Sequence, residues 1–439
     1  MVEMMRIIDT IRLHKRVTLV FALVMAVRCA RAQLTVDSFD GPVTKDEINS
    51  FRALVQTLTP PSSNSGNAWS QGSGGEQARG MGLVYEATGD LGILDQEIRF
   101  CDALLAERND LAPAPLGQHV IWTGRIDPVW PNSFGATIGT GGEQGFVTGN
   151  LGNCALHILQ TPAIWKTEVT IGDPHGFGAT YLQRAKTFVA AADTTIDGHI
   201  LRSQLDLSDH DNHYYFAVGD PYKGGLPVPW NQTMMFNYLF SNMAAAHAIL
   251  GDDPARVARY DGIVQANLDW FFTAGSKSYT DKKGNTAYEW GYSLPATTGE
   301  NTVEGQWDVD GFYRLWLSGR YRFPASKMLP FANTFVDVMI LGPHSFAGLI
   351  DGTSGSSKHA QHSTTIHEGW LLLADLRPDA FHTMMAANLP SSGSTGDLSS
   401  FSRFLFVKNR RFHSSQRSDL SIFSSLTQTL PAVQRASIN

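Results

Sequence analysis

Cysteine is scarce in this sequence, with only three in 439 residues. Cys29 lies in an apolar N-terminal segment, which leaves Cys101 and Cys154 for the rest of the chain. Two cysteines are too few for a disulfide framework or for a cysteine-based zinc cluster. They can form one disulfide bond in an oxidising compartment or remain as two buried thiols, and the sequence leaves both alternatives open.

Charged residues and strand patterns are also sparse. Asp, Glu, Lys and Arg make up 17% of the chain, and the formal net charge is -7. No basic stripe crosses the central region, so nucleic acid is not expected as a partner. The best short strand candidate is His119–Thr123. Hydrophobic residues, in contrast, make up 43% of the chain, which is enough for a large core.

One apolar run has the character of a targeting segment. It covers Val17–Val27, follows three basic residues and precedes an Ala-x-Ala pattern at 30–32. This order is typical of a secretory signal peptide, and the run is too short to span a bilayer. We therefore expect removal of residues 1–32, export to the extracellular space and no membrane attachment afterwards. A glycosylation sequon at 231–233 agrees with export.

The remaining chain repeats a pattern of two helices joined by a short turn that contains Gly, Asp or Pro. The pattern predicts an all-α fold, an (α/α) toroid of helical hairpins around a central cleft, over residues 33–390, with bundle packing as the alternative. Apolar periodicity is lost in the Ser-rich residues 391–439, which we expect to be poorly ordered. The helix pairs are 76–88 with 91–108, 229–250 with 254–273, 309–318 with 325–341, and 368–373 with 380 onward.

Four long polar segments at the ends of these hairpins would line the cleft. Loops of more than about 12–15 residues in a compact domain are usually functional or disordered. These segments contain most of the Trp, His and Asn, which favours function. They cover 109–145, 200–228, 274–306 and 343–366.

Two of the segments resemble helical-toroid lyases that act on polyuronates, namely the alginate and glucuronan lyases. The run Asp211–Phe216 is similar to their Asn-Asn-His-aromatic segment. Trp290-Gly291-Tyr292, the acidic Glu300, and Trp307-Asp308-Val309 before Tyr313-Arg314 are similar to a later segment. The resemblance implies a secreted polysaccharide lyase whose partner is an anionic uronic-acid polymer.

Such a lyase removes the C5 proton of a uronate and expels the C4 oxygen, which requires neutralisation of the C6 carboxylate. Asn212 and His213 fit the neutralising role, and Tyr292 fits the combined role of base and acid. Arg125 can bind a neighbouring carboxylate. We expect neither a cofactor nor a metal, because the spacing of His359, His362 and His367 matches no standard zinc motif. The expected substrate-binding residues are Trp122, Arg125, Trp130, Tyr215, Trp230, Tyr288, Glu300 and His362.

Two other functions remain open at this point. A glycoside hydrolase needs two carboxyl groups that flank the bond. Asp209 or Asp211 can supply one of them, and Glu300, Glu304 or Asp308 the other. A secreted glycan-binding protein without catalysis would carry similar aromatic and polar residues. The concentration of His and Tyr favours an enzyme, because binding alone needs no groups that titrate near neutrality.

The signal-peptide interpretation makes a direct prediction. N-terminal sequencing of the secreted protein should begin at Gln33, or give a blocked terminus if this glutamine has cyclised. A secreted protein that retains residues 1–32 would contradict the prediction.

Overall fold

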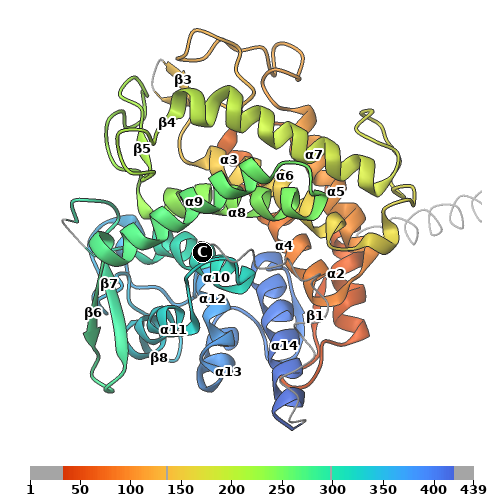
Figure 1. The fold of residues 1–439 in the computed structure, drawn as a ribbon. Coiled ribbons are helices and arrows are strands. Elements are labelled where there is room, and N and C mark those ends of the chain that lie inside the picture. The colour runs from red at the N-terminus through yellow and green to blue at the C-terminus, as the bar shows by residue number, and fades with distance from the viewer. Residues whose placement is uncertain (1–32, 135–136, 297–298, 420–439) are drawn as a thin grey trace, which may run out of the picture.

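Helices make up most of this chain in the computed structural model, which describes residues 33–134, 137–296 and 299–419 (Figure 1). Helix accounts for 54% of the residues and strand for 10%, so the predicted all-α class is confirmed. The predicted signal peptide lies outside the described residues. The α-helices are α2 (Lys45–Thr57), α3 (Gly66–Trp69), α4 (Ser73–Thr88), α5 (Leu91–Ala106), α6 (Glu143–Leu159), α7 (Tyr181–Thr195), α8 (Trp230–Leu250), α9 (Pro254–Trp270), α10 (Thr302–Ser318), α11 (Ala325–Asn333), α12 (Glu368–Leu371), α13 (Phe381–Ala386) and α14 (Leu398–Asp419).

Local chemistry explains where the helical hairpins turn. Gly89 ends α4 in the left-handed conformation, with φ of 67°, and the Asp90 side chain accepts from the Ile93 amide to begin α5. Gly251 ends α8 in the same way, and Asp253 with Pro254 begins α9. These turns lie where the sequence predicted them.

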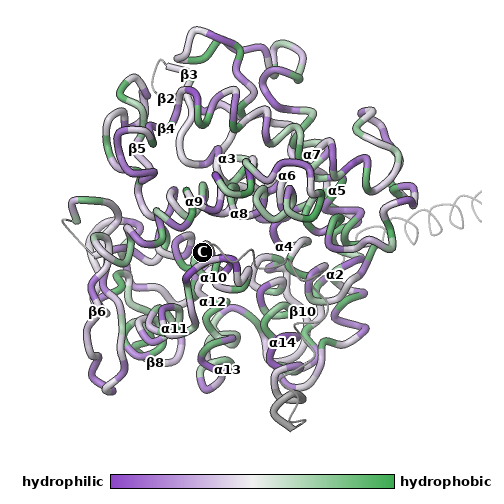
Figure 2. Tube along the Cα trace, viewed as in Figure 1, coloured by the Kyte–Doolittle hydropathy of each residue, from purple (hydrophilic) through white to green (hydrophobic). Residues whose placement is uncertain are grey.

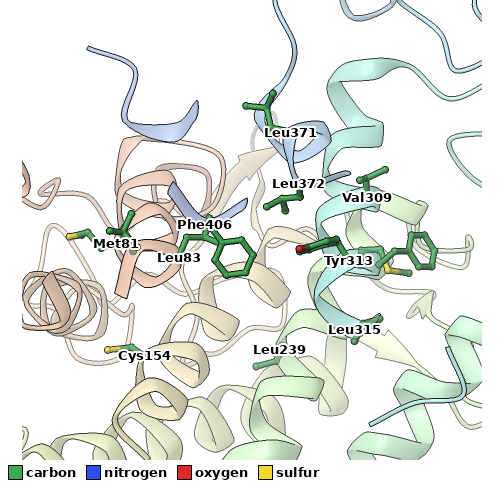
Figure 3. Packing of buried hydrophobic residues seen from close by; sticks show 14 of the residues in the cluster. Met81, Leu83, Cys154, Leu239, Val309, Tyr313, Leu315, Leu371, Leu372 and Phe406 are labelled. Atoms are coloured by element: carbon green, nitrogen blue, oxygen red, sulfur yellow. The ribbon is translucent and has the colours of Figure 1, made fainter. Parts of the chain in front are cut away.

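Six helices, here called the core helices, contact one another in series. They are α4, α6, α8, α10, α12 and α14, and α14 in turn contacts α4. Most of the buried residues labelled in Figure 3 come from these helices, including Leu83, Leu239 and Val309. Helices α6 and α8 approach closely because Gly145 has no side chain; a Cβ there would lie 2.6 Å from the Phe236 amide nitrogen. Polar residues concentrate in the outer turns and loops (Figure 2).

Small strand pairs occupy the connections that lead into the core helices. The pairs found in the described residues are antiparallel and two-stranded, and β4 to β7 lie on the left side of Figure 1. The predicted strand His119–Thr123 is wrong, because this segment enters a turn closed by the Ile121 amide and the Arg125 carbonyl at 3.0 Å. The pairs are β1 (Leu34–Val36) with β10 (Gly393–Thr395), β2 (Asn132–Phe134) with β3 (Thr137–Gly139), β4 (Leu205–Asp206) with β5 (Tyr215–Phe216), β6 (Ser276–Thr280) with β7 (Thr286–Trp290), and β8 (Ile340–Gly342) with β9 (Ser345–Phe346).

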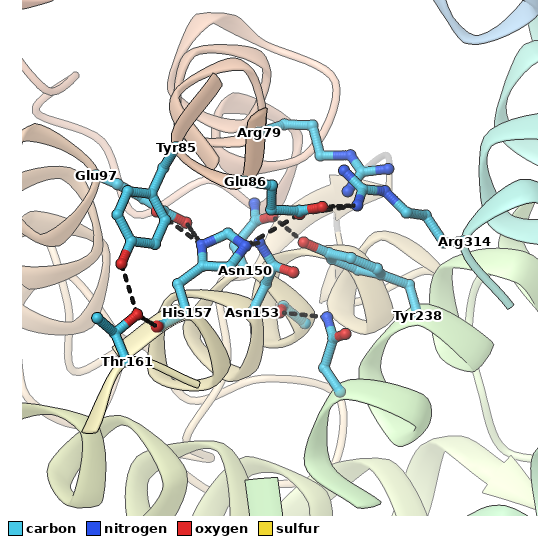
Figure 4. Close-up of polar contacts among 12 residues, drawn as sticks. Arg79, Tyr85, Glu86, Glu97, Asn150, Asn153, His157, Thr161, Tyr238 and Arg314 are labelled. Carbon is cyan, nitrogen blue, oxygen red and sulfur yellow. Dashed lines mark hydrogen bonds and ion pairs between the residues drawn. The ribbon is translucent and has the colours of Figure 1, made fainter. Parts of the chain in front are cut away.

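Buried ion pairs join the core helices across the interior (Figure 4). His157 of α6 lies 3.0 Å from Glu86 of α4 and 2.9 Å from Glu97 of α5, and Arg314 of α10 lies 2.7 Å from Glu86. Burial lowers the pKa of His157, but the two carboxylates outweigh this effect and raise the pKa to about 9. The imidazole is therefore protonated at neutral pH and links three helices.

The expectation of a poorly ordered tail is wrong for residues 391–419. β10 pairs with β1, and α14 packs against α4 with Phe401, Phe404 and Leu405 fully buried. The Lys408 amino group lies 2.8 Å from the buried Glu47 carboxylate. The apolar residues of α14 recur at helical spacing but alternate with Ser, which hides the pattern from composition. Residues 420–439 lie outside the described residues.

Two further features concern export. Cys101 and Cys154 are both buried free thiols, so the disulfide alternative is not formed. Within the part of the chain that the structure describes, no helix is both long and apolar enough to cross a membrane.

The packing of α14 predicts that removal of its central aromatic ring, Phe404, strongly destabilises the fold. Phe404→Ala should lower the free energy of unfolding by about 3–5 kcal/mol, because it leaves a cavity among Phe39, Phe381 and Phe401. Urea denaturation followed by circular dichroism measures the change. His413→Ala on the exposed face of the same helix is the control and should stay within about 0.5 kcal/mol of the wild type. Equal stability of the two variants would show that α14 does not belong to the cooperative core.

Candidate functional site

Three core helices begin side by side with polar residues in their first turns. Glu143 begins α6, Asn231 and Gln232 lie in the first turn of α8, and Glu304 lies in the first turn of α10. We call these four residues the rim. Because residues three or four apart share one helix face, the next turn of each helix presents the floor below the rim.

The floor is aromatic and apolar. Trp307 meets Phe146 edge to face at 5.1 Å between ring centroids, and Phe146 stacks on Tyr238 at 5.1 Å. Met235 belongs to the same cluster, and Trp307 is half-buried. Phe146 and Trp307 each lie three residues beyond a rim glutamate, so Glu143 and Glu304 each lie one helical turn before this contact.

Glu143 is buried, and its carboxylate is held on one side. Asn132 Nδ2 donates to Oε1 at 2.7 Å, and the Gly141 amide donates to the same oxygen at 2.8 Å. The hydrogen bonds from other residues all end on Oε1, which leaves Oε2 for a ligand. Burial raises the pKa of Glu143 against these bonds, so the group is suited to hold and deliver a proton.

Glu304 has a different environment. Its side chain is 24% exposed, Asn231 Nδ2 donates to Oε2 at 2.6 Å, and His359 Nδ1 lies 3.6 Å from Oε1. The side chain of Asn301 caps the start of α10 by accepting from the Glu304 amide at 3.0 Å. The amide donor and the partial exposure distinguish Glu304 from the buried Glu143.

Two tyrosines and a lysine lie between the rim glutamates. Gln232 Nε2 donates to the Tyr222 hydroxyl at 2.9 Å, and the Tyr292 hydroxyl is hydrogen-bonded to Tyr222. Lys223 Nζ lies 4.7 Å from the centroid of the Tyr292 ring. Burial raises the pKa of Tyr292 far above its usual range, and the charge of Glu304 acts in the same direction. This phenol therefore strongly favours its protonated form.

A second pair of carboxyl groups lies deeper. Glu300 and Asp308 are both 0% exposed, and each has one oxygen without a hydrogen-bond partner in the described structure. Burial raises the pKa of Glu300 to about 8, and burial together with Glu300 raises the pKa of Asp308 well above its usual value. Glu300 was predicted to bind substrate, but its burial leaves it no contact with solvent.

Asn212 and His213 make no direct contact with Tyr292 in the described structure. Asn212 is exposed with φ of 64°, and the His213 ring stacks on Trp270 at 4.6 Å. Tyr215 stacks on His210 at 3.7 Å in the same group. The neighbours of Tyr292 are Glu304 and the loop at Tyr222. Trp230 links the two groups, because its amide donates to the Tyr292 carbonyl at 3.0 Å and its ring meets Trp270 at 5.0 Å.

Three aromatic residues predicted to bind sugar belong to the core. Trp130 is 0% exposed and donates from Nε1 to the Leu104 carbonyl at 2.8 Å. Trp230 is 1% exposed and meets Trp270 at 5.0 Å, and Tyr288 packs against Phe331 at 5.0 Å. Exposure of 0% and 1% excludes direct stacking of Trp130 and Trp230 on a sugar, so these two assignments are wrong. Tyr288 is 8% exposed, and its assignment stays a prediction.

The other predicted residues remain near the surface. Trp122 is half-buried, with its ring edge toward His199. Arg125 is paired with Asp127 through Nε at 2.9 Å, and His362 is exposed with Nε2 2.9 Å from Ser345 Oγ. His359 lies beside Glu304 and near enough to His367 to lower its pKa, and the described residues include no group of three or more His, Cys, Asp or Glu that could hold a metal.

The acidic candidates for hydrolysis divide in the same way. Asp209 and Asp211 are exposed beyond β4, whereas Glu304 belongs to the rim. Asn231 is 2% exposed and donates to Glu304, so the sequon at 231–233 is not accessible in the folded protein.

Sequence reasoning missed Glu143, Gln232, Tyr222 and Lys223. A usable signal exists in the first turns of the helices, because Glu143 and Glu304 occupy corresponding places three residues before an aromatic residue. Comparisons with known proteins found no matching family model, no matching curated protein and no matching solved structure.

The buried carboxyl of Glu300 predicts a dependence of stability on pH. Its pKa of about 8 lies above the ordinary value of 4.5, so its protonated form stabilises the fold fully below pH 4.5. This contribution is lost as the pH rises through 8, at no more than about 1.4 kcal/mol for each pH unit. Glu300→Gln carries no titrating proton and should flatten the decline of urea stability between pH 5 and 8. Glu289→Gln on the exposed side of β7 is the control, and equal slopes in wild type and Glu300→Gln would contradict the prediction.

Proposed function

We propose that this chain is a secreted glycoside hydrolase, with Glu143 and Glu304 as its two carboxyl groups. The carrying observation is that both glutamates lie close enough to raise the pKa of Tyr222, and that each lies one helical turn before a residue of the aromatic floor, in unlike environments. Glycosidases need a protonated carboxyl group and an ionised one on either side of the bond. We also propose that the six core helices close into an (α/α) toroid, with the rim at the mouth of its cleft.

The buried Glu143 serves as general acid and protonates the leaving oxygen from Oε2. Glu304, hydrogen-bonded by Asn231, serves as base or nucleophile on the other side. Trp307 offers a face on which a sugar ring can stack. The Tyr222 and Tyr292 hydroxyls lie between the carboxyl groups, where they can position sugar hydroxyls.

The charges of the site favour a neutral glycan. Glu143 and Glu304 are acidic groups of the rim, the second pair of carboxyl groups lies deeper, and Lys223 is a cationic group beside Tyr292. A polyuronate would add further negative charge at close range. This argument supports the hydrolase over the lyase that the sequence motifs suggest.

Polyuronate lyase is the second candidate, and one contact favours it. Lys223 lies beside the rings of Tyr292 and Tyr222, where a cation would help a phenolate to form. In that reaction Tyr292 is the base and acid, and Asn231 and Gln232 take the neutralising role first assigned to Asn212 and His213.

One assay separates the two candidates. The secreted protein is incubated with neutral polysaccharides (mannan, xylan and mixed-linkage β-glucan) and with polyuronates (glucuronan, alginate and polygalacturonate). A rise in reducing ends without absorbance from an unsaturated uronate supports hydrolysis. Absorbance from polyuronates alone would replace the hydrolase with the lyase.

Substitutions in the rim test the assignment of roles. Glu143→Gln and Glu304→Gln should each lower kcat by at least about 100-fold, because each removes an acid or base and keeps the shape of the side chain. Glu289→Gln should remain active. Tyr292→Phe should affect KM more than kcat. A dead Tyr292→Phe variant together with active glutamine variants would reverse the choice in favour of elimination.

A further inference from the structure

The loop that leads into α6 is held by side chains on three sides. The Gly141 amide donates to Glu143 Oε1 at 2.8 Å, and the Gly141 carbonyl accepts from Gln204 Nε2 at 2.6 Å. Gly142 packs against Gln232 so closely that a Cβ would lie 2.3 Å from the Gln232 Cβ. Any shift of this loop therefore moves the Glu143 carboxylate.

Behind this loop lies a buried relay of three side chains. Thr140 Oγ1 lies 2.8 Å from His199 Nε2, and His199 Nδ1 lies 2.8 Å from Asp127 Oδ2. Thr140 and His199 are both 0% exposed. Arg125 and Thr123 also donate to the Asp127 carboxylate, at 2.9 Å each. The relay thus runs from Arg125 at the surface to Thr140, the residue that precedes Gly141 and Gly142.

The direction of the hydrogen bonds in the relay follows from the charges. The His199 ring, with Thr123 and Arg125, outweighs burial and lowers the pKa of Asp127, which is therefore an acceptor, so His199 Nδ1 must donate. Burial outweighs the attraction of Asp127 and lowers the pKa of His199, so the ring is neutral and Nε2 must accept. The Thr140 hydroxyl is then the donor, and its rotation is fixed.

Both His199 and Gln204 come from an uncommon backbone. Residues Ile196–Gln204 continue α7 as a π-helix, which turns these two side chains toward the loop at 140–142. π-Helical segments are rare and occur frequently at functional sites. Ordinary packing of α7 does not require one.

We propose that His199 is a positioning residue: through Thr140, and together with Gln204 on Gly141, it fixes the loop that aims Glu143 at the scissile bond. The proposal rests on the proposed function, in which Glu143 is the general acid. Asp127 selects the tautomer of His199, and Arg125 serves this relay rather than the substrate.

Matched variants test the relay on the polysaccharide of the panel above that the wild type cleaves fastest. Thr140→Val keeps the shape and removes the donor, so kcat should fall by about 10–100-fold with KM nearly unchanged. Thr140→Ser retains the hydroxyl and should stay within about threefold of the wild type. His199→Gln places an amide where Nε2 lies and should be more active than His199→Asn, which keeps only the contact with Asp127. Hydrogen exchange of the peptide that covers 137–145 should rise in Thr140→Val and His199→Asn.

The results of these experiments distinguish a failure of the relay from a failure of the proposed function. If Glu143→Gln is inactive while Thr140→Val turns over like the wild type, the relay does not position Glu143 and the inference fails. If Glu143→Gln is active, the proposed function itself fails, whatever Thr140→Val does. If the Thr140→Val protein does not fold, the activities of His199→Gln and His199→Asn are compared instead. Equal activity of these two variants would also overturn the inference.

Discussion

Ion pairs that are buried between helices constrain the rest of this structure. A charged group removed from water costs several kcal/mol unless a partner meets it with good geometry. Here the partners come from different helices: Arg79 of α4 pairs with Asp310 of α10, and His157 of α6 bridges Glu86 and Glu97. A core helix that slid by one turn would leave several charges unpaired at once. The pairs therefore fix the register of the core helices, and with it the level at which their first turns meet.

That register decides which first-turn residues can work together. Phe146 and Trp307 touch only because α6 and α10 stand at the same height on either side of α8. The rim lies one turn above that contact. A glutamate at the start of an isolated helix has only a local role, in favourable interaction with the helix dipole. Where adjacent helices begin at the same level, such residues come close enough together to form a candidate site.

The sequence was informative where the governing physics is local. Turns at Gly89 and Gly251 follow from residues that are neighbours in the chain. The site depended on contacts between distant residues: Asn231 and Glu304 are 73 positions apart. No local pattern shows which helices begin side by side. The predicted site therefore rested on motifs rich in His and Trp.

The wrong tryptophan assignments and the unpredicted π-helices have related causes. A tryptophan before a helix serves packing as readily as sugar binding, and Trp230 lies against Gly275, which has no side chain to separate them. The three π-helical stretches, Ile196–Gln204, Phe271–Gly275 and Thr334–Met339, have no composition that distinguishes them from ordinary helix. Each ends an outer helix and leads into a strand, namely β4, β6 or β8.

The carboxyl groups of the rim and of the deeper pair lie close together. This arrangement needs an explanation, because like charges repel and burial opposes ionisation. The starts of α6, α8 and α10 supply part of it, since free amides and the helix dipole favour negative charge there. Burial acts in the opposite direction, because it raises the pKa of Glu143 and of Glu300. A further anion placed beside these carboxyl groups would act in the same direction as burial, whereas a neutral group would not. This difference is the physical reason for proposing a neutral ligand.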